Sequence, residues 1–138
     1  MKLRFLSLLL LALGLSATAA HAATSAYAGK YALVVMGTSG PTQSRDALYG
    51  TCTVSSAGSV TINLTREVHG STTGIGQSQV LHGSVSTTGV LNLTGTDSII
   101  NVKFTKSGTT VTGLQGTFTP KPGGDNSNSG ILLGLKQP

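Results

Sequence analysis

The chain has 138 residues, enough for one domain, and a formal net charge of +5 at pH 7. Only 9% of its residues are charged and 4% are aromatic, Trp is absent, and there is one Cys. Gly, Thr and Ser account for 51 of the 116 residues that follow position 22. This composition excludes a helical bundle, a coiled coil, a disulfide-stabilised scaffold and a charge-rich disordered tail, and it leaves a small β-protein.

Residues 1–22 have the pattern of a removable export signal. Lys2 and Arg4 precede an apolar stretch of eleven residues, and Ala20 and Ala22 provide the small side chains that a signal peptidase recognises. The pattern predicts cleavage before Ala23. The alternative, a membrane anchor, is disfavoured because the apolar stretch is shorter than the roughly 20 residues that span a bilayer.

We therefore expect a signal-peptide helix over residues 1–22 and a single domain over residues 23–138, located in the periplasm or secreted, with no transmembrane anchor after cleavage. The cleaved chain retains seven basic and four acidic residues, a net charge of +3. The basic residues are scattered singly and are not interleaved with aromatic residues, so a nucleic-acid partner is not expected.

Apolar and polar residues alternate with a period of two along most of the remaining chain, and turn residues separate the alternating runs. The runs predict strands at 27–36, 48–54, 59–65, 79–86, 90–95, 99–105, 109–114, 116–119 and 131–136. Short turns rich in Gly, Ser and Thr join most neighbours, which predicts antiparallel pairing. Only the connections 66–78 and 120–130 are much longer than a hairpin turn.

The expected fold is all-β, a small antiparallel meander barrel of eight or nine short strands. Closure into a barrel removes the exposed edges that an open sheet would carry. A two-sheet β-sandwich built from the same strands is the alternative. On the strand 99–105 the alternation places Phe104 inside the barrel and Lys103 outside, and on the strand 48–54 it places Cys52 inside, as a small buried hydrophobic residue.

The sequence lacks the residue patterns of known catalytic or metal sites. The cleaved chain has two histidines, His69 and His82, and four acidic residues, without metal-ligand spacing, a nucleophile motif or a dinucleotide-binding motif. We therefore expect no catalytic residue, no metal and no cofactor.

The best binding candidates are Arg66, Glu67 and His69, which form the densest group of ionisable residues and stand at the start of the connection 66–78. Loops held by a rigid scaffold carry recognition more often than strands do. A polar partner, either a small molecule or a protein, would contact this end of the barrel.

Several short motifs resemble those of small exported bacterial Gly/Thr-rich β-barrel proteins of unassigned function. They are Tyr27-Ala28-Gly29-Lys30-Tyr31, Leu81-His82-Gly83-Ser84-Val85 and Val111-Thr112-Gly113-Leu114-Gln115-Gly116-Thr117-Phe118. The chain is also distantly similar to lipocalins, which begin with a Gly-x-Trp strand and carry a late basic residue that packs on it. Here Gly29, Tyr31 and Lys136 occupy the corresponding places. The resemblance implies a barrel and export, and it carries over no catalytic residue.

These observations lead to two hypotheses for function. The first is an exported non-enzymatic β-barrel module with a binding or structural role in the periplasm or outside the cell. The second is a self-assembling or adhesive component of the envelope or cell surface, because strands rich in Thr, Gly and Asn with little charge pair readily with one another.

Overall fold

The structure, a computed structural model, describes residues 24–39, 44–69, 78–93, 98–122 and 129–138. These residues form eight strands: β1 Gly29–Ser39, β2 Ser44–Val54, β3 Ser59–His69, β4 Ser78–Val85, β5 Val90–Leu93, β6 Ser98–Ser107, β7 Thr110–Pro120 and β8 Ser129–Lys136. The expected signal-peptide helix lies in residues 1–23, outside the described residues.

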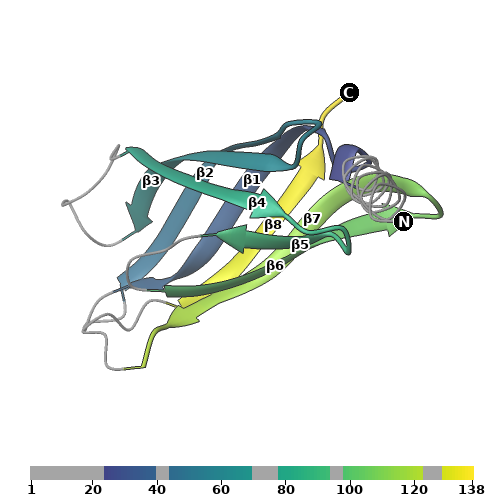
Figure 1. The fold of residues 1–138 in the computed structure, drawn as a ribbon. Coiled ribbons are helices and arrows are strands. Elements are labelled where there is room, and N and C mark those ends of the chain that lie inside the picture. Colours follow the sequence, from purple (N-terminus) through teal and green to yellow (C-terminus); the bar gives the residue numbers. More distant parts are fainter. Residues whose placement is uncertain (1–23, 40–43, 70–77, 94–97, 123–128) are drawn as a thin grey trace, which may run out of the picture.

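The eight strands form one closed antiparallel barrel (Figure 1). Each strand pairs with the next one along the chain, and β8 returns to pair with β1. Strand β1 is thus hydrogen-bonded on both sides, with Tyr31 opposite Cys52 of β2 and opposite Lys136 of β8. The predicted meander barrel is confirmed, and the two-sheet sandwich is not formed.

The two ends of the barrel differ in their connections. At one end, here called the turn end, three short connections contain Gly58, Gly89 and Gly108, whose φ angles are 84°, 77° and 60°. Positive φ at these values strains any residue with a side chain, so glycine allows the strands to reverse within a few residues. The opposite end of the barrel, here called the loop end, is where β1, β3, β5 and β7 end and where β2, β4, β6 and β8 begin (Figure 1).

Several strands extend further toward the loop end than the sequence predicted. β2 begins at Ser44 instead of position 48, and β3 continues to His69 instead of ending at position 65. Residues 66–69 therefore belong to β3 and not to the predicted connection 66–78. Pairing with β2, which places Ala47 opposite Glu67, continues through them.

Strand β1, by contrast, begins at Gly29, two residues later than predicted. Tyr27 lies in the preceding turn, where its backbone N–H donates to the carbonyl oxygen of Thr24 at 3.1 Å. Its side chain is nevertheless buried, with 3% of its surface exposed. The aromatic ring covers the turn end of the barrel instead of extending the strand.

A β-bulge breaks the alternation within β7, which was predicted as two strands, 109–114 and 116–119, and is one continuous strand. The pairing with β6 shifts between Thr105 and Lys106, so that Thr112 has no partner in the register. Because the bulge adds one residue, the inward-facing side chains stand at odd-numbered positions before it, as at Val111. After it they stand at even-numbered positions, as at Leu114 and Phe118. The alternation is therefore broken at residues 112–113, although the strand is continuous from Thr110 to Pro120.

The inward-facing side chains fill the barrel. Those exposed by 5% or less are Tyr27, Tyr31, Leu33, Val35, Cys52, Val54, Val60, Ile62, Leu64, Val85, Leu91, Val102, Val111, Leu114 and Leu132. An eight-stranded barrel is just wide enough for its own side chains or for one small ligand. Here Tyr31, Cys52 and Ile62 have no exposed surface, so the middle of the barrel is occupied by the protein itself.

Near the loop end, two glycines leave space for the aromatic ring of Phe118. A Cβ atom at Gly37 would lie 2.7 Å from Cζ of Phe118, and one at Gly130 would lie 2.6 Å from the same atom. Gly37 and Gly130 are also paired across β1 and β8. Two residues without side chains therefore face one aromatic ring, which packs over both.

Phe104 points inward as predicted, but it is only partly buried. Its ring centroid lies 4.9 Å from that of Tyr27 and 5.3 Å from that of Tyr31. We expect Phe104→Ala to lower the free energy of unfolding by about 2–3 kcal/mol, less than the roughly 3–5 kcal/mol of a fully buried Phe. Lys103→Ala, on the exposed side, should change it by less than about 0.5 kcal/mol. Equal effects in urea titrations would mean that the register of β6 is wrong.

Candidate binding surface

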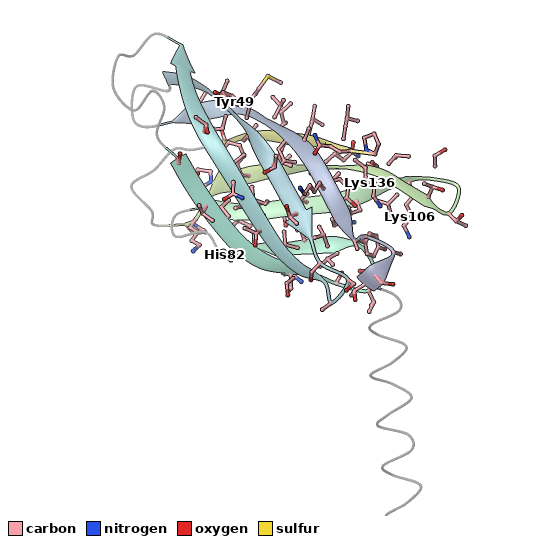
Figure 2. The ribbon with its side chains drawn as sticks, turned by 90° about the horizontal axis from the view of Figure 1, so that it is seen from above. Tyr49, His82, Lys106 and Lys136 are labelled. Carbon is pink, nitrogen blue, oxygen red and sulfur yellow. The ribbon has the colours of Figure 1, made fainter. Side chains whose placement is uncertain are left out.

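The turn end of the barrel is closed by aromatic rings and two lysines. The hydroxyl group of Tyr31 donates to the backbone carbonyl oxygen of Tyr27 at 2.6 Å. Lys106 Nζ lies 4.9 Å from the ring centroid of Tyr27, and Lys136 Nζ lies 5.9 Å from that of Tyr31. Both lysines come to this end of the barrel in Figure 2. Contacts of a cation with a ring stabilise by roughly 0.5–1 kcal/mol at exposed sites.

Lys136 makes the contact suggested by the sequence motif. Gly29 has a φ angle of 144°, which residues with a side chain rarely adopt, and a Cβ atom at this position would lie 2.8 Å from Cε of Lys136. The Gly-x-aromatic element at the start of β1 therefore packs against the basic residue at the end of β8. The contact fixes the place where the first and last strands close the barrel.

The predicted binding candidates Arg66, Glu67 and His69 lie in β3, which corrects their assignment to a loop. Their backbones pair with Leu48, Ala47 and Arg45 of β2. They remain at the loop end, but their side chains are outside the described part of the structure, so their role as binding residues stays a prediction.

His82 and Cys52 occupy the positions that the alternation predicted. His82 is exposed on the outer side of β4. Cys52 is completely buried and is a free thiol that forms no disulfide. Burial raises the pKa of the Cys52 thiol from 9.0 to about 12. The thiol is therefore protonated and enclosed at neutral pH, which makes it unsuited to act as a nucleophile.

A patch of apolar side chains covers the outer side of three adjacent strands, β8, β1 and β2. Three rows of paired residues form it: Leu135, Ala32 and Thr51; Leu133, Val34 and Tyr49; and Ile131, Met36 and Ala47. Of its six large apolar side chains, five are between 44% and 49% exposed and Leu135 is 74% exposed. We call these nine residues the outer apolar patch, and Tyr49 marks it in Figure 2.

Polar residues border the outer apolar patch on both sides. On β7, Gln115 and Thr117 stand next to Leu133 and Ile131, and on β3, Asn63 stands next to Thr51. An apolar centre with a polar rim is the usual arrangement of a protein–protein interface.

An open depression adjoins the patch over β6, β7 and β8. It has a volume of about 440 Å³, and its lining includes Asn101, Lys103 and Gln115 together with Ile131 and Leu133 of the patch. Ligand pockets of small molecules bury most of the ligand surface. Because this depression is wide open, it extends the patch as a contact surface instead of enclosing a ligand.

Neither a metal centre nor a membrane-spanning helix is found in the described ranges. No three His, Cys, Asp or Glu side chains gather there in a group that could hold a metal ion. Among the same residues, no helix has the length and apolar character needed to cross a bilayer.

Comparison of the chain with models of protein families, with curated proteins and with solved structures finds no match. The candidate surface is therefore argued from the physical properties of this chain alone.

Sequence reasoning missed the outer apolar patch, although the sequence carries a signal for it. Val34 and Met36 interrupt the alternation in β1, where Leu33 and Val35 already supply the inward side. The segment 131–135 is likewise apolar at inward and outward positions. When a strand is apolar on both faces, the core covers its inner face and its apolar outer face stays exposed unless a partner covers it. A strand with a polar outer face leaves no such apolar surface.

Because Tyr31 and Cys52 are buried titratable groups, we expect the free energy of unfolding to fall at alkaline pH. Burial, and secondarily the charge of Cys52, raises the pKa of Tyr31 from 10.0 to about 12, alongside the raised pKa of Cys52 itself. The unfolded chain releases both protons at lower pH than the folded protein does. Their contribution is therefore complete below about pH 9 and is lost as pH rises toward 12.

Urea titrations from about pH 8 to about pH 11 should show a falling free energy of unfolding. Cys52→Ala should make the fall shallower, because one of the two groups is removed. A free energy of unfolding that stays constant over this range would contradict the burial of these groups.

Proposed function

We propose that this chain is an exported non-enzymatic β-barrel module with a binding or structural role in the periplasm or outside the cell, and that it binds through the outer apolar patch. The single observation that carries the proposal is the contrast between the two sides of the barrel wall. The interior is filled by the protein's own side chains, whereas apolar side chains on β8, β1 and β2 are left exposed.

Exposed apolar surface of this extent favours a binding role. The largest apolar patch on a typical monomer covers roughly 300–600 Å² and is frequently functional. Here six large side chains lie together on three hydrogen-bonded strands, at the place where the barrel closes.

Export is supported by the basic start, the apolar stretch and the small residues before Ala23. The rest of the outer surface of the barrel supports a location in water and not in a lipid bilayer. Exposed outward positions of the other strands include Asn63, His82, Asn101 and Lys103. A barrel embedded in lipid presents an apolar band on all of its strands.

A structural role without catalysis is supported by the sparse supply of ionisable groups. The chain has four acidic residues, and Cys52 and Tyr31 are buried with the pKa of each raised to about 12, so both are protonated at neutral pH. The alternative function, a self-assembling or adhesive surface component, draws support from the same outer apolar patch, because a sheet face of this kind can cover a copy of itself.

Met36 provides a direct test of whether the patch is covered where the protein works. It lies in the patch, is 46% exposed, and is the one methionine left after cleavage of the signal. Hydrogen peroxide oxidises exposed methionine to the sulfoxide, which peptide mass spectrometry detects. In intact host cells, we expect Met36 to oxidise at least several times more slowly than in urea-unfolded protein.

A matched control is provided by His82→Met, which places a second methionine on the exposed outer side of β4, two strands away from the patch. In the same molecules, this second site should oxidise nearly as fast in cells as in urea. Equal oxidation of the two positions in cells would show that the patch is uncovered and would contradict the proposed function.

A further inference from the structure

The outer apolar patch contains no Asp, Glu, Lys, Arg or His side chain, although the molecule as a whole is cationic. The cleaved chain has a net charge of +3. Lys30 lies just beyond Ala32 on β1 and is exposed, while Lys103 lies two strands away from Leu133. The charged groups thus stand around the patch, and a partner that covers its nine residues does not bury any of them.

We propose that the outer apolar patch binds a second copy of this chain and forms a two-fold symmetric dimer. The inference rests on the proposed function, because it names the partner of the same surface. Symmetric dimers are the commonest assemblies of soluble proteins, and they use one patch that is complementary to itself.

The extent of the patch matches what a stable dimer needs. A standard interface buries roughly 800 Å² on each partner, of which about 65% is apolar in homodimers. Six large side chains exposed by 44–74%, together with Ala32 and Ala47, form a contiguous apolar surface across three strands. The bordering residues Gln115, Thr117 and Asn63 then provide the polar rim.

The position of Lys30 selects the orientation of the two copies. When two sheet faces pack together, the two-fold axis lies between them, either along β1 or across it. An axis along β1 places Lys30 of both copies side by side. An axis across β1 at Val34 separates the two lysines toward opposite ends, which avoids the repulsion between like charges.

The crossed orientation also pairs large residues with small ones. With the axis across β1 at Val34, Ala32 of one copy faces Met36 of the other, since the two are equally spaced on either side of Val34. Val34 and Leu133, which are paired in one row, face their own counterparts. A methionine opposite an alanine fills the space between the sheets without steric overlap.

Light scattering coupled to size exclusion tests the dimer with the mature protein, residues 23–138. At micromolar concentration we expect twice the mass of the chain. Leu133→Lys brings two ammonium groups together at the centre of the interface, so it should raise the dissociation constant by roughly a hundredfold or more and give a monomer. The matched control is Val80→Lys, because Val80 is an equally apolar residue, 53% exposed, outside the patch on β4. It should remain a dimer.

A cross-link across the axis provides a second, independent measurement. Val34→Cys should give a covalent dimer with a short bismaleimide, whereas Val80→Cys should form no covalent dimer under the same conditions. The native Cys52 is completely buried and its thiol pKa is raised to about 12, so it does not compete for the reagent.

The outcomes separate this inference from the proposed function. A mature protein that is monomeric at micromolar concentration and does not cross-link through Val34→Cys overturns the dimer. If Met36 is still protected in host cells, the patch binds another partner, such as a different protein or a membrane surface, and the proposed function stands. If Met36 is also unprotected, both proposals fail. A dimer that persists in Leu133→Lys and dissociates in Val80→Lys overturns the assignment of the interface to this patch.

Discussion

Closure of eight strands into one barrel is the constraint on which the rest of the structure depends. The pairing of β8 with β1 joins the last strand to the first, and it fixes the interior at a size that Tyr31, Leu33, Ile62 and Leu114 fill. Closure requires that the first and last strands approach closely, which the contact of Lys136 with Gly29 and Tyr31 allows at the turn end. Near the loop end, Phe118 packs over Gly37 and Gly130 across the same pair of strands.

A filled barrel moves any recognition to its outer surface or its ends. The strands that close the barrel are also those whose outward side chains are apolar, so β8 and β1 are covered by the core on one side and exposed to solvent on the other. Exposed Leu135, Leu133 and Val34 contribute nothing to the interior. For this contiguous group we propose a partner that covers it, namely a second copy of the same face.

Alternation of apolar and polar residues was sufficient to predict the all-β class, the antiparallel meander and the inward position of Cys52 and Phe104. It failed where the period of two is broken. The continuous strand β7, which carries a bulge at Thr112, was predicted as two strands. The end of β3 was not predicted because the series Val60, Ile62 and Leu64 is followed by Arg66. The outer apolar patch was missed for a different reason. Its rows exist only through the pairing of β8 with β1, which joins residues about 100 positions apart in the sequence.

The central claim is that the barrel interior is filled by the chain itself and that the outer side of β8, β1 and β2 does the binding. Native mass spectrometry of the protein purified from its own host tests this claim most directly. The account predicts a mass equal to two copies of residues 23–138, without any additional small molecule. A monomer that retains a small molecule after gentle desolvation would contradict it, because the interior would then hold a ligand and the outer patch would be unoccupied.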